Sequence, residues 1–357
     1  MTPPTRDELE ARLHYPLGDQ LPGPGCAIDV APGIRWLRMG LPFELNHINL
    51  WLVRDEVEGR QGWTIVDCGI SNDDTRERWK NVFASALDGL PVLRVLVTHM
   101  HPDHIGLCQW LCDHWSAPLY ISATDYNLAR INSQSTLGFG GEPAARFFAT
   151  HGLTDDQAQA QVRNRKSYYP AMVPSVPDTY VRLLDGMTLQ LGQNEWTCIA
   201  GYGHAPEHMA LYCPATGVLI SGDMVLPRIS TNVSVFHMEP LSDPLSLFLS
   251  SLKRYEALPE DTLVLPSHGK PFKGLHERLQ QLNDHHQERL DELTEACRHS
   301  PHHAADALDI LFKRDLDLHQ TTFAMGESLA HLHRLWYSGL VDRVQGEDGV
   351  YRFSAVA

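Results

Sequence analysis

Three histidines and an aspartate lie within six residues in the segment that reads THMHPDH from Thr98. The apolar run Val92–Val97 comes directly before it and predicts a buried strand. His99 and His101 are two residues apart, so on an extended segment both imidazoles project to one side and can bind one metal ion. A proline then turns the chain, which lets Asp103 and His104 reach a second ion. Imidazole and carboxylate groups are ligands for zinc, iron or manganese, so the segment predicts a metal site.

Three further candidate ligands follow downstream, each at the end of a run that predicts a strand. They are His204, Asp223 and His268, in the segments Gly201–His208, Gly217–Asp223 and Thr262–Gly269. Alone, each would more often be an ordinary turn residue. Together, with small neighbours that allow the backbone to approach a shared site, they complete a ligand set for two metal ions.

The elements that must position these residues alternate between strands and helices. Strands are expected at 33–38, 47–53, 63–69, 92–97, 118–122, 181–186 and 196–200, and helices at 73–87 and 105–115. Strand, helix, strand with candidate ligands at the carboxyl ends of the strands is typical of an α/β protein.

Residues 123–180 interrupt the strand pattern with helical runs at 124–132, 143–151 and 155–166. This helical insertion could form a lid or a pocket wall. It contains the aromatic residues Tyr126, Phe139, Phe147, Phe148, Tyr168 and Tyr169, together with Met172. The alternative interpretation is that these side chains simply pack the helices onto the domain.

The candidate residues resemble, in order, the five motifs of the metallo-β-lactamase-fold hydrolase superfamily. The matching positions span most of residues 30–270 and are Asp67, His99, His101, Asp103, His104, His204, Asp223 and His268. The resemblance implies an α/β (α+β) fold, the αββα sandwich, with two facing sheets, helices outside and metals at one edge.

The resemblance also implies a role for each position. His99, His101 and His204 would bind the first metal, and Asp103, His104 and His268 the second, with Asp223 bridging the two. Asp67 would orient a ligand or its loop rather than bind metal. The cofactors expected are two divalent metal ions, zinc first, with iron and manganese as alternatives.

Two positions depart from the family pattern. Glu207 replaces a glycine that is usual in the third motif, and Cys68 stands where a threonine is common. Neither is a ligand position, so both bear on the substrate environment rather than on metal binding. His208 fits the second histidine of the third motif and is interpreted as structural.

The tail suggests a second module after a catalytic domain at residues 1–274. Residues 275–357 read as a linker helix, short helices at 304–313, 322–329 and 329–338, and a terminal hairpin, resembling the subgroup with a carboxyl-terminal winged helix. The linker-helix histidines His276, His285, His286 and His299 are expected on its solvated face. The tail carries 8 basic against 14 acidic residues, so we interpret it as a packing or dimerisation module, with a homodimer left open.

The amino-acid composition of the chain argues against several classes of function. A formal net charge of −15 argues against a general nucleic-acid or anionic-membrane binder. The amino terminus lacks the apolar stretch of a signal peptide, and no apolar run has the ~20 residues of a membrane helix, which predicts a cytoplasmic protein. The seven cysteines show no C-x-x-C pair and suit free thiols, with Cys108 and Cys112 expected as buried small residues.

These observations predict a binuclear metal-dependent hydrolase that uses a metal-bridging hydroxide on a small-molecule substrate. The aromatic insertion favours an ester, thioester or lactone with an apolar acyl group, and Asp103 is the expected catalytic proton carrier. Arg228 could contact an anionic group but is better explained by a surface ion pair. The alternatives are a phosphodiesterase or endoribonuclease, an iron-dependent relative and a non-catalytic sensor.

Overall fold

The computed structural model describes residues 4–134, 140–165, 168–313 and 316–356. Phe139, one of the aromatic residues of the expected insertion, lies outside them. The chain forms two compact units: 1–134, 170–231 and 252–279 make unit 1, and 135–169, 232–251 and 280–357 make unit 2. The domain boundary expected at residue 274 stays a prediction.

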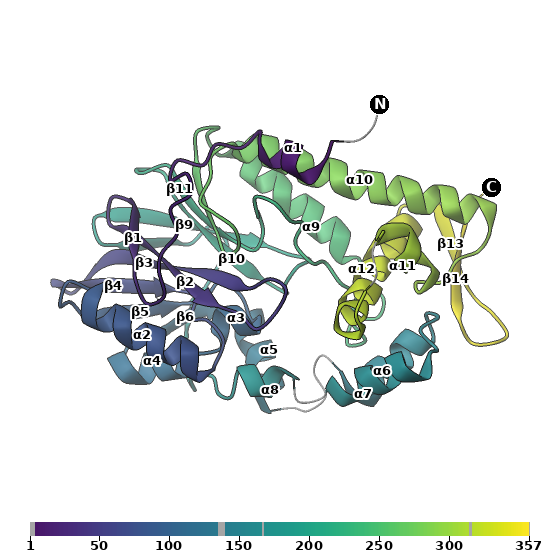
Figure 1. Cartoon of the computed structure of the whole chain (residues 1–357), viewed down its shortest axis with the longest axis horizontal. Helices are drawn as coiled ribbons and strands as arrows, with labels where there is room; N and C mark the ends of the chain where they lie inside the picture. Colours follow the sequence, from purple (N-terminus) through teal and green to yellow (C-terminus); the bar gives the residue numbers. More distant parts are fainter. Residues whose placement is uncertain (1–3, 135–139, 166–167, 314–315, 357) are drawn as a thin grey trace. The chain divides into compact units, whose positions relative to one another are not determined.

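Unit 1 contains a seven-stranded sheet whose strands lie side by side in chain order (Figure 1). The strands are β1 (Ile28–Ala31), β2 (Ile34–Gly40), β3 (His47–Val57), β4 (Arg60–Val66), β5 (Val92–Leu96), β6 (Leu119–Ser122) and β7 (Val181–Leu183). Strands β1 to β4 pair antiparallel and β4 to β7 pair parallel. The parallel half therefore sends the carboxyl ends of β4, β5 and β6 to one edge.

A second, five-stranded sheet completes the sandwich in unit 1. Its strands are β8 (Thr188–Leu191), β9 (Asn194–Gly201), β10 (His208–Cys213), β11 (Val218–Gly222) and β12 (Leu263–Pro266), in the order β12-β11-β10-β9-β8. The sequence did not predict β8 or β10. In β10 all six residues are buried, so the polar–apolar alternation that marks a half-exposed strand is missing.

The core of unit 1 lies between the two sheets. Trp36 and Trp51 of the first sheet and Trp196 and Leu211 of the second belong to one buried cluster. The indoles of Trp36 and Trp51 stack with ring centroids 6.2 Å apart. Packing of both inner faces into one core makes the sandwich a rigid platform for the residues at its edge.

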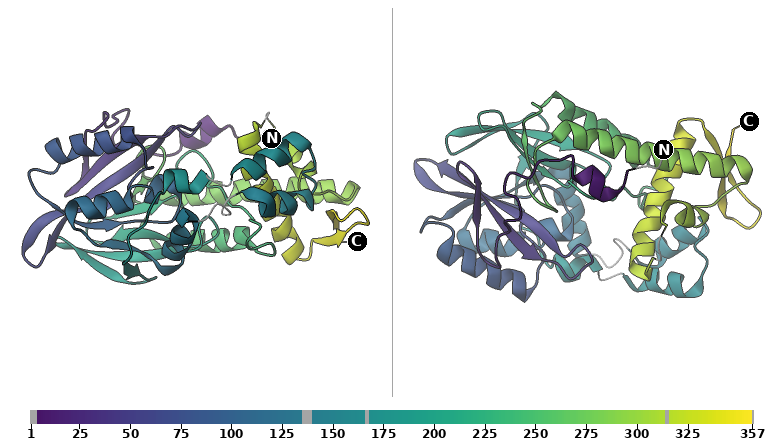
Figure 2. Two further views of the ribbon diagram at one scale, coloured as in Figure 1. Left: turned by 90° about the horizontal axis from the view of Figure 1, so that it is seen from below. Right: turned by 45° about the horizontal axis from the view of Figure 1, so that its top comes forward.

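Helices of unit 1 pack against its first sheet. The helical elements are α1 (Arg6–Glu10), α2 (Asp73–Ser85), α3 (Pro102–Ile105), α4 (Cys108–Trp115), α5 (Ala123–Gln134), the end of α8 (Tyr168–Met172), the 3₁₀ segment η2 (Lys253–Ala257) and the start of α10 (Leu275–His299). The blue helices α2 and α4 lie along the outer face of the first sheet (Figure 2). On the second sheet, η2 is held to β9 by Arg254, which donates to Ala200 O at 2.7 Å.

Unit 2 contains the remaining helices and the terminal hairpin. These are α6 (Gly141–Ala149), α7 (Asp156–Asn164), α9 (Pro244–Leu252), α11 (Asp306–Leu311), α12 (Leu318–Tyr337), β13 (Val341–Gln345) and β14 (Tyr351–Ala355). The hairpin β13–β14 is antiparallel, as the Gly-Glu-Asp-Gly turn predicts. Among the described residues, no helix combines the length and the apolar character that crossing a membrane requires.

Two expectations about the tail were wrong in detail. The two helices expected between residues 322 and 338 form one helix, α12, which starts at a capping box between Asp317 and Gln320 and tolerates Gly326 in its interior. His286 of α10 is buried rather than solvated, because it continues the helical stripe of Leu279 and Leu282 at spacings of three and four residues.

Candidate metal centre

Five chain segments bring the predicted site residues to one edge of the sandwich. Asp67 follows β4, His99 follows β5, His204 follows β9, Asp223 follows β11 and His268 follows β12. All five strands end toward the same edge, so residues as far apart as 99 and 268 converge. The structure therefore brings together every position predicted from the sequence.

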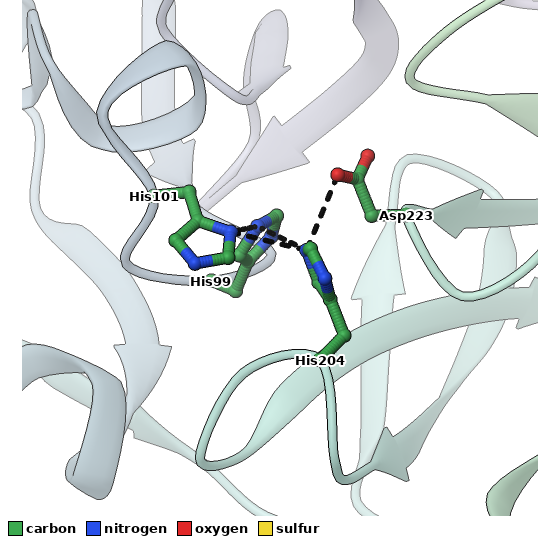
Figure 3. A group of neighbouring side chains, drawn as sticks. All are labelled: His99, His101, His204 and Asp223. Atoms are coloured by element: carbon green, nitrogen blue, oxygen red, sulfur yellow. Dashed lines mark hydrogen bonds and ion pairs between the residues drawn. The ribbon is translucent and has the colours of Figure 1, made fainter. Parts of the chain in front are cut away.

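The first group consists of His99, His101, His204 and Asp223 (Figure 3). His99 Nε2 lies 2.8 Å from His101 Nδ1 and 3.2 Å from His204 Nε2. His101 Nδ1 is 3.1 Å from His204 Nε2, and Asp223 Oδ2 is 3.2 Å from the same atom. Three ring nitrogens and one carboxylate oxygen thus face one point.

The second group consists of Asp103, His104 and His268. Asp103 Oδ2 is 3.6 Å from His104 Nε2 and 3.4 Å from His268 Nε2. Asp223 Oδ1 is 3.5 Å from both of these nitrogens. One oxygen of Asp223 therefore faces each group.

The donor atoms of both groups fit divalent metal ions. Zinc–nitrogen bonds of about 2.1 Å in a tetrahedron place ligand atoms about 3.4 Å apart, close to the separations in both groups. His104 Nε2 and Asp223 Oδ1 are buried, and no described residue hydrogen-bonds to either atom. Buried polar atoms of this kind require a partner, and a cation between them would supply it.

The pKa shifts of the site residues also favour a bound cation. Although burial opposes it, the carboxylates of Asp103, Asp67 and Asp223 raise the pKa of His104 well above its ordinary value, and those of Asp223 and Asp103 raise the pKa of His268 to about 10. Burial lowers the pKa of His101 to about 3 and that of His99 well below its ordinary value. The first group therefore presents neutral imidazoles, and the second concentrates acidic oxygens that attract positive charge.

Hydrogen bonds on the far side of the imidazoles fix their orientation. His104 Nδ1 donates to Asp67 Oδ2 at 2.8 Å, and His268 Nδ1 donates to the main-chain oxygen of His47 at 2.7 Å. Both rings therefore direct Nε2 at the centre. Asp67 also accepts hydrogen bonds from Thr98 N at 2.8 Å and from the Thr98 hydroxyl. This position agrees with the expected orienting role of Asp67.

Asp125 of α5 is a positioning residue that the sequence did not single out. Its buried carboxylate accepts from Met100 N at 2.8 Å and from Glu207 N at 2.7 Å. Met100 lies between two candidate ligands and Glu207 shortly after His204, so one side chain joins two ligand-bearing loops. Burial raises the pKa of Asp125 to about 6.

Asn49 of β3 is a second residue that the sequence analysis missed. Its amide donates to Pro266 O at 2.8 Å and to Gly269 O at 3.0 Å, which fixes the loop that carries His268. The available signal was a polar residue inside the apolar run of β3, where a buried amide needs partners.

The remaining motif residues are structural. His208 Nε2 accepts from Asp223 N at 3.1 Å, and the Cys68 carbonyl accepts from Trp79 Nε1 at 2.8 Å. Glu207 accepts at its side chain from the Thr124 hydroxyl at 3.0 Å. Arg228 forms ion pairs with Asp7 and Glu10, which agrees with the expected surface role.

Comparisons with known proteins agree with the fold and the motif order. The model of the metallo-beta-lactamase superfamily matches residues 44–268, and that of the metallo-beta-lactamase-like C-terminal domain matches residues 290–356. The chain belongs to the metallo-beta-lactamase superfamily. The sequence-based prediction of this family and of its sandwich fold is confirmed, whereas the winged-helix subgroup stays a prediction.

Two solved structures cover nearly the whole chain, and a curated relative covers most of it. A beta-lactamase domain protein from Burkholderia ambifaria is 52% identical, with a TM-score of 0.93 over 98% of this chain and 99% of that one. A metallo-beta-lactamase family protein from Thermus thermophilus is 27% identical, with a TM-score of 0.74 over 92% of this chain and 100% of that one. The probable metallo-hydrolase YqjP of Bacillus subtilis (strain 168) is 22% identical over 302 residues, 83% of this chain and 90% of that protein. Family and candidate centre together define a metallo-hydrolase of this superfamily.

Proposed function

We propose that the protein is a binuclear metal-dependent hydrolase that cleaves an ester, thioester or lactone with an apolar acyl group. The observation that carries the proposal is the division of Asp223 between two ligand groups. Its Oδ2 lies 3.2 Å from His204 Nε2, and its Oδ1 lies 3.5 Å from the Nε2 atoms of His104 and His268. Two complete donor sets that share one carboxylate support two ions rather than one.

Each ligand group would hold one ion, with Asp223 between them. When bound, such ions supply Lewis acidity, which polarises an acyl carbonyl and lowers the pKa of water toward neutrality. Zinc suits the mixed imidazole and carboxylate set, and the same set accommodates iron or manganese.

Asp103 is the proposed proton carrier. Its Oδ2 faces the Nε2 atoms of His104 and His268. Although burial opposes it, His104 lowers the pKa of Asp103 to about 2, so the group is an ionised carboxylate at neutral pH. Its side chain is 19% exposed, against 10% for Asp223, so Asp103 is the more accessible of the two to a leaving group.

The substrate class rests on charge more than on the insertion. A net charge of −15 disfavours a polyanionic substrate such as RNA. Two aromatic residues of the expected insertion are engaged in packing: the Tyr126 hydroxyl donates to Pro177 O at 2.8 Å, and Tyr169 is 2% exposed. They therefore do not by themselves define an acyl pocket, and a small acyl substrate remains the proposal.

The test combines metal analysis with hydrolysis on one purified sample. The panel contains acyl-CoA thioesters, lactones, aryl esters, bis-aryl phosphodiesters and single-stranded RNA, with Asp103→Asn as the catalytic variant. Asp113→Asn is the control, because Asp113 lies on the outer helix α4 and its exposed carboxylate accepts a hydrogen bond from Gln109 of the same helix. Acyl turnover with two bound ions, lost in Asp103→Asn and kept in Asp113→Asn, is the expected result. Turnover of phosphodiesters or RNA alone would overturn the acyl assignment, and a single bound ion would overturn the binuclear one.

A further inference from the structure

A hollow of about 380 Å³ opens beside the metal centre within unit 1. It lies between the amino-terminal segment, strand β2, the start of β3 and helix α2. Its walls are apolar at Leu21, Pro22, Pro24 and Met39 and basic at Arg38 and Arg78. The volume falls within the range of small-molecule sites, about 300–1,000 Å³.

Arg38 is a half-buried cation without an acidic partner in the described part of the chain. The described residues provide its guanidinium with no hydrogen bond or ion pair, and burial alone lowers its pKa. A guanidinium removed from water without compensation costs free energy unless a ligand supplies an anion. Other half-buried arginines of unit 1 differ in this respect: Arg35 pairs with Asp29 and Asp88, and Arg94 pairs with Asp55.

Arg78 provides the second cation of the hollow. Its Nε lies 2.8 Å from the carboxylate of Asp74, whose side chain is 59% exposed. A terminal guanidinium nitrogen of Arg78 lies 3.4 Å from the position that a Cβ on Gly40 would occupy. The guanidinium group therefore reaches β2, a strand that lines the hollow. With one acidic partner among the described residues for two guanidinium groups, the hollow keeps a net positive charge in a chain whose net charge is −15.

His47 connects the hollow to the metal centre. Its side chain lines the hollow, its main-chain oxygen accepts from His268 Nδ1 at 2.7 Å, and its ring centroid lies 6.1 Å from that of His268. His47 Nε2 accepts from Gly269 N at 2.9 Å, so this ring is neutral and leaves the two arginines as the cations. A molecule in the hollow is thus one residue away from a candidate ligand of the second ion.

We propose that this hollow binds the anionic group of an amphiphilic substrate, a carboxylate or an organic sulfate, while the apolar walls contact the adjoining carbon chain. Both anions present paired oxygens to a planar guanidinium fork. The inference deepens the proposed function, on which it rests: the acyl bond would be cleaved at the metal centre, and a remote anion would set the orientation of the substrate. An anionic end also explains why a site for an apolar acyl group has two arginines beside it.

Binding can be tested without hydrolysis. Calorimetric titration of the metal-containing full chain would use hexanoate and hexyl sulfate as probes, with 1-hexanol as the uncharged probe and inorganic sulfate as the head group alone. We expect saturable binding of hexanoate or hexyl sulfate, weakened about tenfold or more in Arg38→Gln, which loses a charge-assisted hydrogen bond, and unchanged in Arg60→Gln. Arg60 is exposed at the start of β4 and does not line the hollow. No binding by the unaltered protein, or equal binding by both variants, would refute the proposal, and the stronger of the two anionic probes identifies the class of anion.

Kinetics separate the hollow from the hydrolytic centre. The substrates would be the 4-nitrophenyl ester of hexanoic acid and the mono-4-nitrophenyl ester of adipic acid, which carries a terminal carboxylate on a chain of the same length. Arg38→Gln is expected to raise KM for the carboxylated ester alone and to leave kcat for both unchanged. A loss of kcat on both esters would instead show a general structural effect and contradict the assignment. If the protein bound the anions but hydrolysed none of the esters, the anion site in the hollow would be supported and the proposed reaction would be rejected. Failure of the anion site is therefore distinguishable from failure of the proposed function.

Discussion

The carboxylate of Asp67 accepts a hydrogen bond of 2.8 Å from His104 Nδ1, and both side chains are buried. Asp67 adopts a left-handed backbone conformation with φ 64°, which is uncommon for a residue other than glycine. The turn after β4 therefore keeps an unfavourable conformation that places this carboxylate under the histidine. Strain of this kind persists where the surrounding structure requires it, frequently at a functional site.

Replacing Asp67 by Asn tests this relationship. Thr98 N donates to Oδ1, so the new amide nitrogen would take the place of Oδ2, face His104 Nδ1 and favour the tautomer that carries its proton on Nε2. We expect the affinity for the second ion to fall about 10–100-fold while the fold is kept. Metal titration followed by calorimetry measures the effect, and two unchanged binding steps would contradict it.

The two ligand groups predict different losses for different histidines. His268→Ala removes a donor of the second group only, and His101→Ala removes one of the first group only. Each variant is expected to retain about one ion per chain instead of two, because the other donor set stays intact apart from the shared Asp223. Elemental analysis of the purified variants measures the content. Loss of both ions in both variants would show that the groups bind as one unit.

Asp125 is expected to affect both groups at once. Asn in its place keeps one acceptor oxygen but turns an amide toward either Met100 N or Glu207 N, so one of the two loop contacts is lost. Metal affinity should fall about tenfold or more at both sites, as for other groups that support ligands. Ser122→Ala is the matched control, because its hydroxyl reaches the same carboxylate at 3.3 Å without joining the loops. A weaker effect in Asp125→Asn than in the control would reject the joining role.

The candidate ligands could be singled out from the sequence because most of the information that marks them is local. The spacing between His99 and His104 places four donors within one turn of chain, and His204, Asp223 and His268 each follow a strand that the apolar pattern indicates. The supporting contacts could not be predicted in the same way. The contact between Asp125 and Glu207 joins residues 82 positions apart, and that between His47 and His268 joins residues 221 apart. The expectation that His286 is solvated was wrong for a related reason. This histidine lies on the apolar stripe of α10, and its partner, His331, comes from another helix.

His331 predicts how stability depends on pH. Its Nδ1 donates to Glu327 O at 2.9 Å in α12, and burial lowers its pKa to about 4 from an ordinary value of 6.5. Between pH 6.5 and 4 the unfolded chain binds a proton at this histidine, whereas the folded chain does not. The free energy of unfolding therefore falls as the pH drops through this window, and above it the contribution of His331 to stability is fully present. His331→Gln should flatten this dependence by about one proton. Denaturant titrations at several pH values measure the slope, and His299→Gln, at an exposed position, should leave it unchanged.

Gly222 at the end of β11 and Gly217 in the turn before it allow the effect of backbone strain to be measured apart from that of a steric clash. Gly217 and Gly222 both adopt left-handed conformations, with φ 63° and 54°. A Cβ at Gly217 would meet nothing within 4 Å, whereas one at Gly222 would collide with His208 Nε2. Gly217→Ala is therefore expected to cost about 1–2 kcal/mol of stability with normal metal content.

Gly222→Ala should reduce both the stability and the metal content more than Gly217→Ala does. The new methyl group displaces His208, which accepts the main-chain hydrogen bond of Asp223 at 3.1 Å, so the shared carboxylate of the two groups loses its support. We expect a larger loss of stability and reduced content of both ions, measured by thermal unfolding and elemental analysis of the two variants side by side. Equal behaviour of the two variants would mean that only the backbone conformation matters. In that case His208 would not be what holds Asp223 between the two groups.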